Sequence, residues 1–326
     1  MFPSMRHPYR YVWDFWYYFD PKTALYHLFY LNADEILVPS VKHHHAACVG
    51  HAVTSDFLRI EWSGEKEFDI LKPPKHHWAN TSIWSGDIIK IKNGFLLFYT
   101  SRNRELDDGM TQNIGVAYTD NILSNRWQLS LMQVPPGYCY QLKNSLGDLS
   151  THAWRDPFLF QDNGQIYMLL SAKSTKEPIG RNGVVGLLRL KDNNLSKGEW
   201  EYLDPILNPC SYSEMEVPQL YKDSQGKYEL VFSTWAKNDF AAATRQAGGL
   251  QGFTSSNFRN FSGIPHVLLP EKYGLYACRV IPELDGEIVG FDTQEGGIRR
   301  SGVRTNFKHV DRDFSKYSFN INELGI

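Results

Sequence analysis

The chain has 326 residues, of which 42% are hydrophobic and 21% are charged, the balance of an ordinary globular protein. Its formal net charge of −2 gives no electrostatic reason to expect a nucleic acid or an anionic membrane as a partner. No apolar run approaches the roughly 20 residues that cross a bilayer. The first residues lack an apolar run followed by a small-residue cleavage site, so we expect a cytoplasmic protein, or a secreted one whose leader is absent from this sequence.

The aromatic residues and the cysteines give two further indications about fold and function. Aromatic residues are abundant at 14%, which suits strands and also sugar binding, because aromatic rings stack on the apolar faces of sugar rings. The cysteines lie far apart and have no Cys-x-x-Cys spacing; they are Cys48, Cys139, Cys210 and Cys278. We therefore expect buried thiols and neither a disulfide framework nor a zinc site.

One pattern occurs five times along the chain. Each copy has polar or charged residues, then a short turn, then a strand rich in Tyr, Phe, Leu and Ile; the copies are residues 13–31, 84–101, 154–172, 215–234 and 277–293. The turn position is held by Ala24, Gly94, Gly164, Gly226 and Gly286, at intervals of 60–70 residues. A short polar turn between two strands predicts a hairpin in each copy.

Five hairpins at this period predict an all-β fold, a five-bladed β-propeller in which each blade is a four-stranded sheet. Helical periodicity is scarce, and no linker interrupts the chain, so we predict a single propeller domain over residues 1–326. A β-sandwich is the competing fold, but the regular spacing favours the propeller.

Carboxylates occupy similar places in three of the five copies. Asp14 lies ten residues before Ala24, Asp156 lies eight before Gly164, and Glu216 lies ten before Gly226. We interpret these as equivalent positions, so that the three side chains should meet where the innermost strands surround the axis. Glycoside cleavage needs such a group, since one carboxyl must donate a proton while another is ionised. The alternative is that each caps a turn or strand end.

At these residues the chain resembles the β-fructosidase superfamily, glycoside hydrolase families 32 and 68. The similar segments occur in the family order, and their order and spacing are more specific than any one of them. They are Val12–Trp16 (Trp-Asp-x-Trp), His51–Asp56 through Trp62 (Gly-His-Ala-x-Ser-x-Asp-Leu ending in Trp), Trp84–Gly86 (Trp-Ser-Gly), Leu97–Thr100 with Asn103 (Phe-Tyr-Thr-Gly-Asn), Arg155–Pro157 (Arg-Asp-Pro) and Glu216–Pro218 (Glu-Cys-Pro or Glu-Arg-Pro).

The resemblance implies a role for each matched residue. Asp14 would be the nucleophile, Glu216 the general acid and base, and Asp156 the transition-state stabiliser. Substrate-binding roles fall to the other matched residues, with core packing as the alternative for the two tryptophans and for His51; these residues are Trp13, Trp84, Ser85, Arg155, His51 and Asn103. The substrate implied is a β-fructofuranoside, such as sucrose or a fructo-oligosaccharide, cleaved by a retaining double displacement.

The chain departs from the family pattern in three places. Its first motif lacks the Asn-Asp-Pro-Asn-Gly form of most family 32 enzymes, and Val217 replaces Cys or Arg after Glu216. Glu214 lies two residues away on the same face of a strand and is a rival for the acid. The sequence also ends too early for a C-terminal β-sandwich, which resembles the plan of family 68.

Histidine runs at 43–45 and 76–77 suggest a metal, but adjacent strand residues point to opposite faces, so we expect a loop or a pocket rim. His152 lies four residues before Asp156 and could reach the sugar. We predict no metal and no cofactor, with a structural Ca²⁺ left open because no acidic cluster identifies one. Nothing in the sequence predicts the oligomeric state.

Several functions fit the same residues. An inverting arabinofuranosidase or xylosidase propeller uses a similar trio of carboxylates, with the first activating water. A fructosyltransferase uses the same residues and excludes water from the second step. A sugar-binding propeller without catalysis is the alternative from outside the enzymes.

Overall fold

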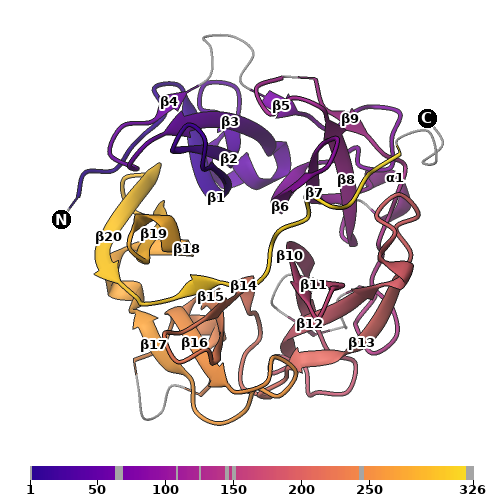
Figure 1. Cartoon of the computed structure of the whole chain (residues 1–326), viewed down its shortest axis with the longest axis vertical. Helices are drawn as coiled ribbons and strands as arrows, with labels where there is room; N and C mark the ends of the chain where they lie inside the picture. The colour runs from indigo at the N-terminus through magenta and orange to yellow at the C-terminus, as the bar shows by residue number, and fades with distance from the viewer. Residues whose placement is uncertain are drawn as a thin grey trace.

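The computed structural model describes residues 2–62, 69–107, 109–124, 126–143, 147–148, 152–241 and 246–320. Five antiparallel sheets stand around a central axis (Figure 1). This arrangement confirms the predicted five-bladed β-propeller. In each blade the chain starts at the axis and proceeds outward through consecutive strands.

The blades follow the chain order. Blade 1 consists of β1 (Arg10–Asp20), β2 (Leu25–Asp34), β3 (Cys48–Thr54), β4 (Glu61–Trp62) and β5 (Asp69–Leu71). Blade 2 consists of β6 (Ile83–Ile91), β7 (Gly94–Arg102), β8 (Gln112–Thr119) and β9 (Gln128–Leu129). Blade 3 consists of β10 (Trp154–Asp162), β11 (Gln165–Lys173), β12 (Gly183–Leu190) and β13 (Trp200–Leu207).

The last two blades are less regular. Blade 4 consists of β14 (Glu216–Lys222), β15 (Tyr228–Thr234), β16 (Gly249–Ser255) and β17 (His266–Leu269), with β21 (Lys308–His309) on its inner side. Blade 5 consists of β18 (Leu275–Ile281), β19 (Glu287–Asp292) and β20 (Ile298–Arg304). The helices in the described residues are short: α1 (Arg104–Asp107), η1 (Ser40–Ala46), η2 (Lys191–Asn193), η3 (Ala236–Asn238), η5 (Glu271–Tyr273) and η6 (Pro282–Leu284).

The five predicted hairpins are present, each joining the first two strands of a blade. The residue at every predicted turn position has a positive φ, from 55° at Ala24 to 151° at Gly94. Glycine adopts this backbone region at little cost, which explains why four of the five copies have it there. Ala24 adopts the same region with a Cβ atom, and its turn is therefore strained.

The prediction of four strands per blade needs correction at three blades, of which blade 1 has a fifth strand because β5 pairs with β3 beside β4. Blade 5 contributes three strands of its own, and the N-terminal segment completes it through a bridge between Met5 and Ile298. Blade 4 gains a fifth strand because β21 pairs with Tyr221 and Lys222 of β14. An early residue, Met5, therefore adds to blade 5, and the late strand β21 adds to blade 4, although neither is next to that blade in the sequence.

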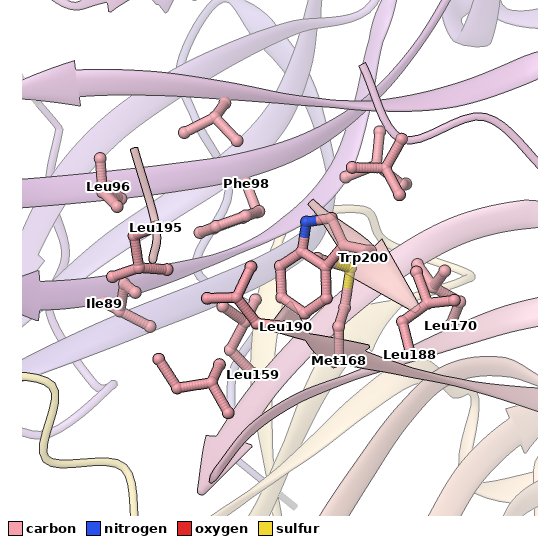
Figure 2. Packing of buried hydrophobic residues seen from close by; sticks show 14 of the residues in the cluster. Ile89, Leu96, Phe98, Leu159, Met168, Leu170, Leu188, Leu190, Leu195 and Trp200 are labelled. Carbon is pink, nitrogen blue, oxygen red and sulfur yellow. The ribbon is translucent and has the colours of Figure 1, made fainter. Parts of the chain in front are cut away.

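The core lies between the blades, because each sheet is apolar on both faces. A buried cluster fills each of the five blade interfaces. The cluster between blades 2 and 3 is shown in Figure 2, where Trp200 lies among aliphatic side chains such as Leu190 and Met168. Phe98 of blade 2 meets Trp200 of blade 3 edge-on, with 6.4 Å between ring centroids. Interdigitated packing of this kind fixes how the blades are placed around the axis.

The C-terminal segment, residues 305–320, crosses the turn end of the axis beside the inner strands of blades 4, 3 and 2 (Figure 1). After β21, Gln161 N–H donates to Asp311 O at 2.8 Å, and Lys92 N–H donates to Tyr317 O at 2.8 Å. Arg312 donates to both carboxylate oxygens of buried Asp87, at 2.7 and 2.9 Å. We call this the C-terminal segment below.

The four cysteines are free; the prediction of buried thiols is confirmed for Cys139 and Cys278, whereas Cys48 and Cys210 are only partly covered. Among the described residues, no helix has the length and apolarity needed to span a membrane.

Candidate active site

The innermost strand of every blade is bent by a bulge near its first residues. The pairing register shifts between Val12 and Phe15, and at the corresponding place in β6, β10, β14 and β18. Three of these bulges contain a residue with positive φ: Asp156, Val217 and Ala277. A bulge leaves residues unpaired and re-aims their side chains. The five bulges together therefore direct side chains toward one end of the axis.

The register corrects the expected equivalence of the three carboxylates. They come from the same end of β1, β10 and β14, but they occupy three consecutive positions relative to the bulge. Glu216 is the last paired residue before its bulge, Asp156 is the first residue within its bulge, and Asp14 is the second. Counting from the turns could not reveal this stagger, because the strands differ in length between bulge and turn.

Asp14 is held by a side chain of the next blade. The Ser85 hydroxyl donates to Asp14 Oδ2 at 2.6 Å. Burial raises the pKa of Asp14 to about 6 and the charge of Glu216 adds to the rise, while the Ser85 hydrogen bond and the Arg279 charge oppose it. Asp14 is thus an ionised carboxylate above about pH 6, next to a second carboxyl group.

Asp156 is 4% exposed and is tied to both neighbouring blades. Its backbone N–H donates to Thr100 Oγ1 at 3.1 Å, and its Oδ2 accepts the N–H of Val217 at 3.0 Å. Burial raises the pKa of Asp156 to about 7; the Arg155 charge opposes this, and the charges of Glu216 and Asp14 support it. The pKa values of Asp14 and Asp156 are thus both raised, as expected where buried like charges are brought together.

Arg155 lies among the acidic residues. Its Nη2 is 2.8 Å from Glu216 Oε1 and 3.5 Å from Glu214 Oε1, and its Nε is 3.7 Å from Asp156 Oδ2. Burial alone would lower the pKa of Arg155, but these three carboxylates raise it. Arg155 Nη1 also donates to the carbonyl oxygen of His152 at 2.8 Å. The guanidinium thus orients the acidic side chains, whereas the sequence resemblance implied substrate binding by this arginine.

Glu216 and its rival Glu214 have different surroundings. Glu216 Oε2 accepts a hydrogen bond from Tyr276, whose ring stacks on Trp235 with 3.9 Å between centroids. Glu214 Oε2 accepts a hydrogen bond from Asn238 at 2.8 Å. The Glu216 side chain is 18% exposed and that of Glu214 is 10% exposed, so Glu216 is the more accessible of the two.

The helix η1 covers the rim beside blades 1 and 2. Trp13 packs edge-on against His43 and His44, with centroid distances of 4.6 and 5.4 Å. Trp84 Nε1 donates to His44 O at 2.8 Å, and the Arg102 guanidinium lies 4.4 Å from the Trp84 ring centroid. Burial and His43 lower the pKa of His44 to about 4, while Glu216 opposes this, so His44 is a neutral group close to Glu216. The histidine run forms a pocket rim, as predicted.

Three residues considered from the sequence do not contribute their side chains to this cluster in the contacts described, although the backbone carbonyl of His152 accepts from Arg155. His51 is buried on β3, the third strand of its blade, where its ring stacks on His27 at 5.3 Å. Asn103 accepts a hydrogen bond from Asn80 Nδ2 at 3.0 Å and shapes the turn that precedes α1. His152 is 1% exposed, and its ring contacts Gln141 O at 2.9 Å. The contacts described here connect them to packing and turn residues and not to Asp14 or Asp156.

Sequence reasoning missed Tyr276, Thr100 and Arg279. Tyr276 immediately precedes the fifth repeated segment, at the same position before its bulge as Glu216. That equivalence could have identified it. Thr100 lies in a segment matched to the family. It links blade 2 to blade 3, because its Oγ1 accepts the N–H of Asp156 from blade 3 and donates to Ser85 O of blade 2 at 2.9 Å.

A hollow of about 380 Å³ opens between blades 1 and 5. Its lining includes Trp13, His43 and Phe291, together with Arg10 and Gln294. Phe291 meets Tyr276 edge-on, with 6.5 Å between ring centroids. The hollow thus borders Trp13, which precedes Asp14 in the sequence, and Phe291, which contacts the tyrosine that donates to Glu216. Within the described ranges, no three His, Cys, Asp or Glu side chains are arranged to hold a metal ion.

Solved structures with the same fold are carbohydrate-active proteins. An inulosucrase from Halalkalicoccus jeotgali bound to kestose matches with a TM-score of 0.66 and 20% identity, covering 90% of this chain and 79% of that one. A levansucrase from Gluconacetobacter diazotrophicus matches with a TM-score of 0.61 and 20% identity, covering 94% and 81%. At this identity the matches establish the fold.

Two sequence comparisons are more specific. A sucrose-6-phosphate hydrolase from Lactococcus lactis subsp. lactis is 26% identical over 187 residues, 57% of this chain, and the chain spans about a third of that curated relative. The model of the glycosyl hydrolases family 32 N-terminal domain matches residues 17–259. This range contains Asp156 and Glu216 and begins three residues after Asp14. The chain belongs to the family of the glycosyl hydrolase family 32 N-terminal domain.

Proposed function

We propose that this chain is a glycoside hydrolase that cleaves a β-fructofuranoside, such as sucrose or a fructo-oligosaccharide, with retention of configuration. The observation that carries the proposal is the meeting of carboxyl groups from three inner strands: buried Arg155 pairs with Asp156 and Glu216, and the charges of both Asp14 and Glu216 raise the pKa of Asp156. Membership of family 32 supports a fructofuranoside over an arabinofuranoside or a xyloside.

In the first step, Asp14 attacks the anomeric carbon of the fructosyl unit while Glu216 donates its proton to the leaving oxygen. The glycosidic bond breaks, and a bond from Asp14 to the sugar forms. The Ser85 hydrogen bond orients Asp14 for this attack. Arg155 and Tyr276 hold the Glu216 carboxyl group from two sides.

In the second step, Glu216 accepts a proton from water, and the resulting hydroxide displaces Asp14 from the anomeric carbon. Asp156 binds ring hydroxyls in both steps; its position between Arg155 and the Val217 N–H keeps it in place as charge develops on the sugar. Trp13, Trp84 and His44 form one wall of the sugar site, and the hollow between blades 1 and 5 receives the second sugar unit.

Proton NMR of the protein incubated with single sugars tests the proposal. The panel contains sucrose, sucrose 6-phosphate, kestose and an arabinofuranoside. We expect fructose to appear from at least one of the first three, with the anomer formed first matching the β configuration of the substrate. Arabinose as the only product would move the substrate class, a growing trisaccharide signal would indicate fructosyl transfer, and binding without turnover would favour a sugar-binding propeller.

Matched variants assign the residues. Asp14→Asn and Glu216→Gln should each lower kcat by about 10³-fold. Glu214→Gln keeps the same chemistry of substitution two residues away and should retain most of the activity. The reverse order of the two glutamate variants would assign the acid to Glu214.

A further inference from the structure

The bulges of the inner strands are joined across blades 5, 1 and 2 by one side chain. Arg279 is the first paired residue after the bulge of β18 and is 4% exposed. Its Nε donates to Phe15 O at 3.0 Å, and its Nη2 lies 3.5 Å from Gly86 O, at the limit of a hydrogen bond. Phe15 and Gly86 are themselves the first paired residues after the bulges of β1 and β6.

These two carbonyl groups lie next to the pair that the proposed chemistry uses. Phe15 follows Asp14, and Gly86 follows Ser85, whose hydroxyl donates to Asp14 Oδ2 at 2.6 Å. Gly86 itself is confined, because a Cβ atom there would lie 2.0 Å from Phe98 O. A group that contacts both carbonyls therefore fixes the distance between the strands that bear Asp14 and Ser85.

We propose that Arg279 is a positioning residue for the reaction, which holds Asp14 against Ser85 by bridging the strands behind them. The proposal rests on the proposed function in one respect, the assignment of Asp14 as the nucleophile. It adds a residue from blade 5 to a site whose carboxylates come from blades 1, 3 and 4. The family resemblance assigned no role to this residue.

The charge of Arg279 gives it a second effect on the same group. Asp14 faces Ser85 from β6, Glu216 from β14 and Arg279 from β18, and of these only Arg279 carries a positive charge. Arg279 in turn faces Asp87, Tyr221, Asp156 and, from the C-terminal segment, Arg312. Removing the guanidinium would raise the pKa of Asp14 further, because no positive charge among these neighbours would then oppose the charge of Glu216.

A purely structural arginine makes a different prediction. If Arg279 only fills the axis, its loss should lower stability and leave the titration of Asp14 unchanged. Arg312 provides the matched control, because it is a second arginine near Asp87 and close enough to Arg279 for their charges to interact. It binds Asp87 and lies 4.5 Å from the Phe158 ring centroid, and its recorded contacts include neither Phe15 nor Gly86.

The first experiment measures the titration of Asp14 without any substrate. The full chain is labelled with ¹³C at aspartate carboxyls, and the Asp14 signal is assigned by its loss in Asp14→Asn. In Arg279→Met we expect the pKa of Asp14 to rise by about half a unit or more. In Arg279→Lys, which keeps the charge, the pKa should stay closer to that of the wild type, and in Arg312→Met it should be unchanged. An unchanged pKa in Arg279→Met would overturn the electrostatic part of the proposal.

The second experiment uses the sugar on which the wild type turns over. Arg279→Met should lower kcat by about 10- to 100-fold, with a smaller change in KM, because it disturbs the reacting group more than sugar binding. Arg279→Lys should be intermediate, since a single ammonium group cannot bridge two carbonyls as a guanidinium does. Arg312→Met should keep the wild-type kcat when activity is normalised to the folded fraction.

A double-variant cycle separates positioning from general damage. If Arg279 acts through the Asp14–Ser85 pair, the combined loss in Arg279→Met/Ser85→Ala is smaller than the product of the two single losses. Losses that multiply fully, or a kcat unchanged in Arg279→Met, would contradict the proposal. Absence of turnover by the wild type would count against the proposed function alone, and the titration would still decide the role of Arg279.

Discussion

At the scale of single residues, the site combines buried acids with few compensating charges. Asp14 and Asp156 have pKa values raised to about 6 and about 7, whereas an exposed aspartate titrates near 3.8. A carboxyl group whose pKa is higher in the folded protein binds its proton more tightly there. Its contribution to stability is therefore largest at low pH and declines as the pH rises from about 4 to about 7.

Asp156→Asn should make this cost measurable. The amide oxygen can still accept the Val217 N–H, but it never ionises, so the variant escapes the decline. We expect the melting temperature of the variant relative to the wild type to increase between pH 4 and pH 8, reaching a gain of about 2 °C or more, while activity is lost. Calorimetry at pH 4, 6 and 8 measures it. A difference in melting temperature that is independent of pH would show that ionisation of Asp156 does not destabilise the folded protein.

Tyr276→Phe removes one of the two groups that hold Glu216 and keeps the ring that stacks on Trp235. A hydrogen bond to a charged group contributes about 1.5–3 kcal/mol, so kcat should fall by about 10- to 100-fold. Tyr118→Phe is the control, because it also removes a tyrosine hydroxyl, one that donates to Asn93 O at 2.7 Å in blade 2. Equal kcat values for the two variants would mean that Arg155 alone orients Glu216.

At the scale of elements, the hairpin turns explain how much of the fold was predictable. A turn with positive φ favours glycine strongly enough for Gly94, Gly164, Gly226 and Gly286 to indicate the period. The bulges gave no comparable signal. Their residues differ from blade to blade, since Asp156, Val217 and Ala277 all adopt the same positive φ. The end of the axis where the carboxylates meet could therefore be predicted, but their stagger could not.

Ala24→Gly tests the strain at the first turn. Ala24 has a φ of 55°, a region in which a Cβ atom costs about 1–2 kcal/mol. Replacement by glycine should stabilise the protein by about 1 kcal/mol after the added freedom of the unfolded chain is subtracted. Urea unfolding measures the change. Lys22→Gly in the same exposed turn is the control and should be neutral or destabilising, because Lys22 has no positive φ to relieve; equal effects of the two changes would exclude strain at Ala24.

The contacts made between elements also show which of the two readings left open for His51 the structure favours. His51 lies in a segment similar to a family motif, but the motif does not say on which strand of a blade it falls. The structure places it on the third strand from the axis, against His27 and Phe29. Arg155, in contrast, lies next to Asp156 on an innermost strand, and sequence proximity was enough to place it.

At the scale of the whole molecule, the two ends of the propeller axis differ. One end holds the carboxylates. The other is crossed by the C-terminal segment, whose Arg312 binds Asp87, a residue only 1% exposed. Sequence patterns gave no sign of this closure, because the segment has little regular structure and its partners are dispersed over three blades. The single-domain boundary at residues 1–326, without a C-terminal β-sandwich, stays a prediction.

Arg312→Met should destabilise the fold, because it leaves the Asp87 charge buried without its cation. The expected loss is about 3 kcal/mol in the free energy of unfolding. Asp87→Asn/Arg312→Met should recover part of it, since the unpaired charge is then absent. Arg304→Met removes an exposed arginine that pairs with exposed Asp285 and lies 3.7 Å from Glu287, whose shorter pair with Arg300 remains, so it should cost less than about 1 kcal/mol. Equal losses for Arg312→Met and Arg304→Met in urea unfolding would argue against a structural role for the axial pair.

The position of the C-terminal segment has a consequence for synthesis of the protein on the ribosome. Residues 305–320 leave the exit tunnel only after the strands of all five blades have been made, yet they contact the inner strands of blades 2, 3 and 4, whose residues were made long before. Blade 5 waits as well, because Met5 can pair with Ile298 only after residue 298 has emerged. During translation the early blades therefore exist as an open arc, and the ring becomes complete only after residues 298–320 have emerged.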